Sequence, residues 1–319
     1  MSKNIEHDGA RWIQTPLKMV LQFIELFNYP ICLDLNDSKR VVIDYDEASI
    51  ADRLQKLEDK AITHIYLRDE DMMAFMRDVK KILEQEKIGS GALTPQEIMS
   101  EVCSISTCYE FMKTAFTQLG FSERSLILAE EINRRSMKAV RETPNLVELL
   151  RNLRNDLHPH FMRALLSGSM SACLVDAFNW GNQEIKEKVS LGAMLTQLNW
   201  EQKHFEIFDE GTQLHLLKML PIEMAEKLRR ANTFSKEVIE IVEQAFENPE
   251  RSGFPRGIDS SGIGRLPALH IVSSQFIKKL VEREFDYSAK NQIVEELKAQ
   301  YNQGQFVQIM EGVSRMFAA

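Results

Sequence analysis

Hydrophobic and polar positions divide the chain into an N-terminal part of mixed periodicity and a longer part whose pattern is almost wholly helical. Residues 12–27 carry apolar side chains at helical intervals, which predicts a helix. Residues 30–35 alternate apolar and polar as a half-buried strand does, and residues 39–45 repeat the alternation after a polar turn. These two segments predict a β-hairpin.

The rest of the N-terminal part predicts two helices and one more strand. A helical pattern covers residues 47–59, and residues 62–67 form the third predicted strand. Asp69 or Asp71 is placed to cap a second helix. We therefore expect a small α/β domain over residues 1–87. The outer strand of its three-stranded sheet would be open to pairing with a strand of a partner.

Beyond this domain the pattern predicts a mainly α architecture. Residues 88–92 contain two glycines and little charge, which is typical of a linker. Thr94 and Glu97 form a capping box with Pro95 at the first helical position, and Ser122 is expected to cap a further helix. We assign residues 88–144 to this linker and to connecting helices, and residues 145–319 to a helical domain. Its helices are expected near residues 145–156, 159–180, 183–198, 210–230, 235–247, 265–283, 289–301 and 304–317.

Composition and charge exclude several classes of function. Lysine and arginine total 39 and aspartate and glutamate 47, so the net charge is −8 and a binder of nucleic-acid polymers is not expected. No run of about 18 uncharged apolar residues predicts a membrane span. The first residues lack the layout of a signal peptide, and the four cysteines form no CxxC pair. We expect a cytoplasmic protein with reduced thiols.

One segment interrupts the helical run. Residues 248–264 hold four glycines and two prolines between two predicted helices. Such composition is typical of a surface connection whose path is set by its glycines and prolines. Long ordered loops in compact domains are also often functional. The sequence leaves both interpretations open.

This loop carries a resemblance to a known family. Residues 247–258, ENPERSGFPRGI, resemble the signature loop of the HD-GYP family, which are bacterial metal-dependent phosphodiesterases of cyclic-di-GMP. Phe254 stands where the family usually has tyrosine, and Ile258 replaces leucine. The resemblance extends over roughly residues 145–285 and implies a helical HD-GYP-like bundle after the small α/β domain. The positions that match the loop pattern are Glu247, Ser252, Gly253, Pro255, Arg256 and Gly257.

The same resemblance implies that the family's metal ligands are missing. The positions where the family has histidine or aspartate ligands are Thr196, Gln197, Leu220, Ala245, Phe246 and Gln275. Three of these side chains are apolar and the other three are polar but neutral, so they do not supply the imidazoles and carboxylates that activate a metal-bound water. Trp200 stands where the family has a phosphate-contacting lysine, and with Phe246 it would fill the former site. We therefore expect no metal, no cofactor and no catalytic residue.

The retained loop predicts an interaction protein, a pseudo-enzyme of the HD-GYP class. Its partner would be a signalling protein such as a GGDEF-type domain, or a second copy of the chain. Phe254 is a candidate exposed aromatic for the contact, and Arg256 is suited to a carboxylate or phosphate. Alternatively, Phe254 and Pro255 pack the loop onto their own domain. The candidate binding residues are Gly253, Phe254, Pro255, Arg256 and Gly257.

Two other functions remain open from the sequence. In a cyclic-di-GMP receptor that does not cleave its ligand, Arg251, Arg256 and Lys218 would meet phosphates, and Trp200 or Phe246 would stack on guanine. In a divergent phosphodiesterase, unconventional side chains would hold the metal.

Overall fold

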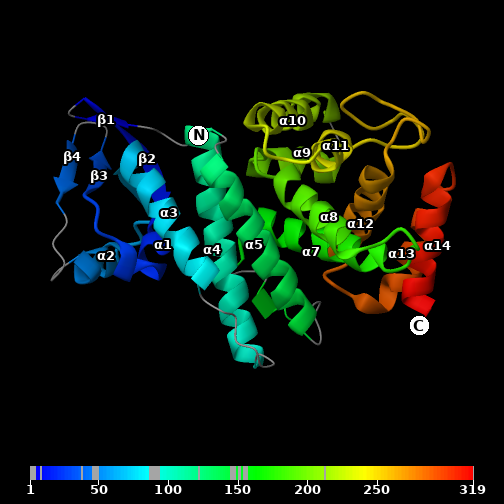
Figure 1. The fold of residues 1–319 in the computed structure, drawn as a ribbon, viewed down its shortest axis with the longest axis horizontal. Helices are drawn as coiled ribbons and strands as arrows, with labels where there is room; N and C mark the ends of the chain where they lie inside the picture. The colour runs from blue at the N-terminus through cyan, green and yellow to red at the C-terminus, as the bar shows by residue number, and fades with distance from the viewer. Residues whose placement is uncertain are drawn as a thin grey trace. The chain divides into compact units, whose positions relative to one another are not determined.

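The computed structural model divides the chain into two compact units, Met1–Ile132 and Asn133–Ala319 (Figure 1). The residues that the structure describes are 5–7, 9–36, 39–44, 50–85, 94–120, 123–143, 149, 152–153, 157–211 and 213–318. The predicted linker at 88–92 and the predicted cap at Ser122 lie outside them.

The first unit contains an antiparallel sheet of five strands in the order β1-β2-β5-β3-β4. Its strands are β1 (Ile5–His7), β2 (Ala10–Pro16), β3 (Ile31–Asn36), β4 (Lys39–Ile43) and β5 (His64–Arg68). The predicted hairpin is confirmed as β3 and β4, which pair with Cys32 opposite Val42. The third predicted strand is confirmed as β5. The sheet extends beyond the three predicted strands because β1 and β2 add to it.

The prediction of a helix over residues 12–27 is wrong for its first half. Residues Ala10–Pro16 form β2, and helix α1 (Leu17–Gln22) begins only after Pro16. Trp12, Ile13 and Thr15 are all buried, because β2 lies between β1 and β5 and also contacts helices α3 (Asp69–Gln85) and α4 (Pro95–Leu119). A strand buried on both faces loses the alternation that identifies strands in a sequence.

Helix α4 belongs to this first unit. The helices here are η1 (Ile24–Leu26), α2 (Ile50–Asp59), α3 (Asp69–Gln85) and α4 (Pro95–Leu119), and α5 (Glu123–Glu142) crosses the boundary between the units. The predicted capping box at Thr94 is confirmed, with Glu97 N–H donating to the Thr94 hydroxyl. Arg11 Nη2 donates to Gln118 O at 2.7 Å, which fixes the end of α4 to β2. The assignment of residues 88–144 to a linker and connecting helices stays a prediction.

The second unit is mainly helical in its described residues. It contains α7 (Pro159–Val175), α8 (Gln183–Thr196), α9 (Gln202–Glu210), η2 (Leu214–Leu217), α10 (Met219–Ala231), α11 (Lys236–Gln244), α12 (Arg265–Glu282), η3 (Tyr287–Ala289), α13 (Lys290–Gln300) and α14 (Gln305–Ala318). α7 is the central helix, buried along most of its length and in contact with α8, α12 and α14. The predicted helix over 210–230 starts too early, because Gly211 at φ +68° ends α9 and α10 begins at Met219.

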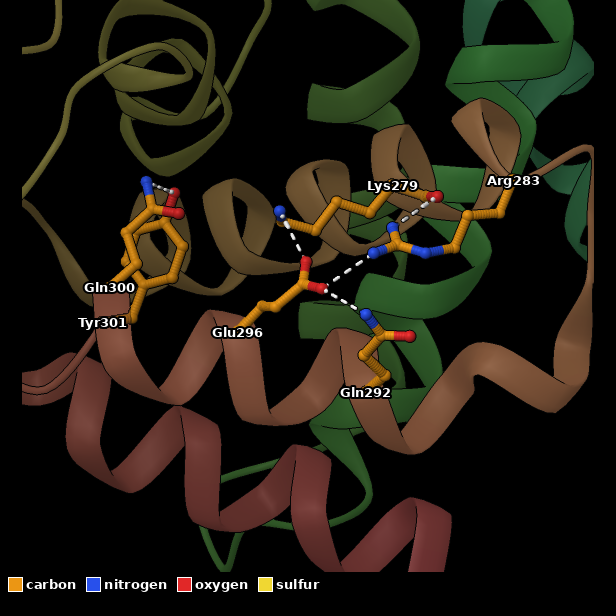
Figure 2. A network of polar contacts seen from close by, with 6 residues as sticks. All are labelled: Lys279, Arg283, Gln292, Glu296, Gln300 and Tyr301. Carbon is orange, nitrogen blue, oxygen red and sulfur yellow. Dashed lines mark hydrogen bonds and ion pairs between the residues drawn. The ribbon is translucent and has the colours of Figure 1, made fainter.

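A group of charged side chains fixes α13 to α12 (Figure 2). The Glu296 carboxylate accepts hydrogen bonds from Lys279 at 2.9 Å, Arg283 at 2.7 Å and Gln292 at 3.1 Å. The hydrogen bond from Lys279, more than any other cause, holds the pKa of Glu296 below its usual value. No helix among the described residues is both long and apolar enough to cross a membrane.

Candidate functional site

The loop between α11 and α12, residues 248–264, is held by one buried carboxylate. Glu247 is 3% exposed, and its Oε1 accepts the backbone N–H of Arg256 at 2.7 Å. Its Oε2 accepts the N–H of Ile258 at 3.1 Å. At the far end of the loop, Gln244 Oε1 accepts the N–H of Gly264 at 2.7 Å. Side chains at the end of α11 therefore fix both the middle and the exit of the loop.

Two glycines of the loop are required by its geometry. A Cβ atom at Gly253 would lie 2.3 Å from the backbone nitrogen of Asn248, so no larger residue fits there. Gly257 has φ +62°, in the left-handed region that favours glycine. Between them, the Phe254–Pro255 peptide bond is cis. These motif positions thus have a structural role.

Phe254 is not the exposed aromatic that the sequence suggested. It is 3% exposed, and its N–H donates to Phe246 O at 2.9 Å. Its ring stacks on that of Phe246, with centroids 5.1 Å apart and planes 6° apart. The alternative interpretation, in which Phe254 packs the loop onto its own domain, is the one that the structure has.

The side chains at three positions of the implied active site lie in one apolar cluster with Phe254. Trp200 stacks on Phe246 with centroids 4.7 Å apart, and both contact the ring of Phe208. Leu220 packs against the same cluster, and Asn199 Nδ2 donates to Leu220 O at 2.7 Å. Stacked aromatic volume therefore occupies the space beside the loop.

Two polar members of the implied site, Thr196 and Gln197, are buried and uncharged. Thr196 donates its hydroxyl hydrogen to Gly192 O at 2.7 Å, within its own helix. Gln197 lines a cavity of about 20 Å³ beside Trp200, and within the described residues its Oε1 has no hydrogen-bond partner. That volume holds about one water molecule. Ala245 is buried at the end of α11, and Gln275 is half-buried and does not line this cavity.

These residues do not fit a metal centre. Amide, hydroxyl and hydrocarbon groups supply no charge to offset a dication, and a cavity of about 20 Å³ leaves no room for bound water and substrate. No group of three or more His, Cys, Asp or Glu in the described part of the chain is placed to hold a metal ion. His270, on α12, is fully buried, and burial lowers its pKa to about 4, so it is neutral at pH 7.

The arginines of the loop already have carboxylate partners. Arg256 pairs with Glu243, whose other oxygen pairs with Arg229 of α10. Arg251 pairs with Asp259 at 2.5 Å. The pKa of Asp259 lies below its usual value, chiefly because the Ser261 hydroxyl donates to it, with Arg251 adding to the effect. Lys218, the third predicted phosphate contact, is exposed on the turn before α10.

Sequence reasoning missed a pair of exposed apolar side chains next to the aromatic cluster. Leu216 and Met219 are each 54% exposed, while Leu217 between them is buried in the cluster. The signal was present: residues 214–220 hold five large apolar side chains in seven positions, more than one buried helix face accommodates. Because a continuous helix was expected over residues 210–230, this excess of apolar side chains was not interpreted as an exposed pair.

A comparison with solved structures gives the fold. The solved structure of Bd1817, an HDG"Y"P protein from Bdellovibrio bacteriovorus, aligns with a TM-score of 0.58 over 97% of this chain and 100% of that one. The chain has an HD-GYP-like fold. The sequences are 14% identical, so the likeness concerns architecture. No protein-family model matches the sequence, and no curated protein matches it. The expected fold class, a mainly α HD-GYP-like bundle preceded by a small α/β part, is confirmed.

Proposed function

We propose that the protein is a non-catalytic, cytoplasmic signalling protein of the HD-GYP type, which acts in cyclic-di-GMP-related signalling by binding another protein. Two features support the loss of catalysis. The positions of the implied metal ligands hold neutral side chains, and two of them, Leu220 and Phe246, pack in one apolar cluster with Trp200. A scaffold without a metal-bound water has no nucleophile for phosphodiester hydrolysis.

The observation that carries the binding role is the exposure of Leu216 and Met219 beside the loop scaffold. Exposed apolar side chains that rest on a rigid, buried cluster are typical of protein interaction sites. A partner that offers apolar side chains suits this surface. A GGDEF-type domain or a second copy of the chain is the proposed partner.

The test is a binding assay with purified GGDEF-type domains of the source organism and with the protein itself. Leu216→Ser and Met219→Ser should each weaken binding, and the double Leu216→Ser/Met219→Ser variant should abolish it. Val307→Ser is the matched control, because Val307 is an exposed apolar residue of α14, 40% exposed. Unchanged binding by the double variant would contradict this surface as the interface.

The structure favours a cyclic-di-GMP receptor less. Trp200 is buried and stacks on Phe246, so neither ring offers an open face to guanine. Arg251 and Arg256 are paired with carboxylates. Calorimetry with the dinucleotide separates the two proposals, since saturable heat would establish the receptor. For a divergent phosphodiesterase, the deciding measurement is elemental analysis together with a hydrolysis assay.

A further inference from the structure

A polar groove lies in the helical unit between the turn that follows α7 and the exposed side of α14. Its volume is about 630 Å³, within the range of small-ligand sites. The turn contributes Trp180, α12 contributes Arg265 and α14 contributes Arg315. None of the residues that line it belongs to the loop 248–264 or to the aromatic cluster.

Arg265 is positioned by an aromatic pair. Its guanidinium carbon lies 5.2 Å from the centroid of the Trp180 ring, a cation–π distance. Phe178 stacks on Trp180 with centroids 4.8 Å apart and planes 11° apart. A Cβ at Gly312 would lie 2.8 Å from the Phe178 ring, so this glycine lets α14 approach the pair closely. The indole is therefore fixed, and Arg265 loses little side-chain freedom when it binds a ligand.

Arg315 is positioned from the other wall. Its Nη2 donates to the backbone oxygen of Ala177 at 3.2 Å, which leaves most of its donors available. Neither Arg265 nor Arg315 forms an ion pair with a carboxylate of the described residues. Glu311 is the one carboxylate among the lining residues, and the nearby Asp176 is paired with Lys186 at 2.6 Å. The groove therefore carries an excess of positive charge in a chain whose net charge is −8.

We propose that this groove binds a small oxyanion ligand, one that bears phosphate or carboxylate groups, between Arg265 and Arg315. Planar guanidinium groups bind either kind of oxyanion through paired N–H donors, and such charge-assisted hydrogen bonds are stronger than neutral ones. The site is independent of the proposed partner surface, so either proposal can fail without the other.

The test uses the full chain with pyrophosphate and with citrate as probes. Trp180 is half-buried and touches Arg265, whereas Trp12 and Trp200 are each 1% exposed, so ligand binding should change the fluorescence of Trp180. We expect a saturable change at millimolar probe concentration. Arg265→Ala and Arg315→Ala should each weaken binding about tenfold. Arg265→Lys should restore only part of the affinity, because lysine keeps the charge and loses the planar fork.

Calorimetry provides a second measurement that does not depend on tryptophan. Binding of pyrophosphate alone would assign the site to phosphate ligands, and binding of citrate alone to carboxylates; either result supports the proposal. Arg251→Ala is the matched control, because Arg251 is an exposed arginine of the loop. An equal loss of affinity in Arg251→Ala, or the absence of saturable binding of both probes in calorimetry, would overturn it.

Discussion

The ring of Phe254 lies parallel to the ring of Phe246, 5.1 Å away centroid to centroid. One residue belongs to the signature-like loop and the other occupies a position where the resemblance implies a metal-binding histidine. Because Phe246 also stacks on Trp200, the three rings join the loop to the segment before α9. The aromatic cluster thus holds together parts of the chain that a metal centre would otherwise connect.

Removal of the Phe254 ring should destabilise the helical unit. Phe254→Ala leaves a cavity against Phe246, and we expect the free energy of unfolding to fall by about 3–5 kcal/mol. Urea denaturation followed by Trp200 fluorescence measures the loss. Leu216→Ala is the control, since Leu216 is exposed and its change should stay within about 0.5 kcal/mol. A similar, small effect of both substitutions would show that the stack contributes little.

Glu247 should control the shape of the loop. Glu247→Gln places an amide N–H against one of the backbone donors at Arg256 and Ile258, which then lacks an acceptor. We expect a loss of about 1–3 kcal/mol of stability and faster hydrogen exchange of these two amides. Glu250→Gln, at an exposed position of the same loop, should leave both measurements unchanged. Protected amides in Glu247→Gln would contradict the role of this carboxylate.

His270 should make the helical unit sensitive to acid. Burial lowers the pKa of its imidazole from 6.5 to about 4 in the folded protein. Between these values the unfolded chain binds the proton and the folded chain does not, so stability falls as the pH drops from about 6.5 to about 4 and then levels off. The shift corresponds to a loss of about 3 kcal/mol.

His270→Leu removes this titration while it keeps an apolar side chain in the buried position. Denaturation curves at a series of pH values should show a flatter dependence for the variant across this interval. His215, an exposed histidine whose replacement leaves the core intact, provides the control variant His215→Leu. If His270→Leu and the unmodified chain lose stability in parallel, another group causes the acid sensitivity.

Metal removal should leave the protein unchanged. Treatment with EDTA should not alter the melting temperature or the circular dichroism spectrum, because the candidate positions offer neutral side chains around a cavity of about 20 Å³. Elemental analysis should find iron, manganese and zinc far below one atom per chain. A stoichiometric metal whose removal lowers the melting temperature would contradict both the conclusion that these residues do not fit a metal centre and the proposed loss of catalysis.

Much of the fold was accessible from the sequence because the helical unit has regular periodicity and clear caps. The helices from α11 to α14 follow directly from local signals, and so does the capping box at Thr94 in the first unit. Strand β2 was not predicted because Trp12, Ile13 and Thr15 are buried together. Its hydrophobic pattern therefore continues into that of α1 without a break. Local periodicity does not reveal how many neighbours a strand will have.

The candidate site could be predicted from the sequence only in part, for a different reason. Leucine and phenylalanine side chains cannot ligate a metal, so the sequence alone shows that Leu220 and Phe246 supply no ligand. Whether Phe254 faces solvent or the core depends on contacts across the chain, which a loop sequence does not encode locally. The exposure of Leu216 and Met219 likewise depends on the start of α10 at Met219, which the sequence pattern does not indicate.

Glu247 uses both of its oxygens on backbone amides of the loop. The shape of the loop therefore rests on an internal carboxylate, and no cation is needed to maintain it. Proteins with this scaffold can therefore differ at the metal-ligand positions while the loop keeps the same conformation. A search that selects sequences by this loop would therefore find proteins that share the fold. Whether each of them hydrolyses a phosphodiester would have to be measured separately.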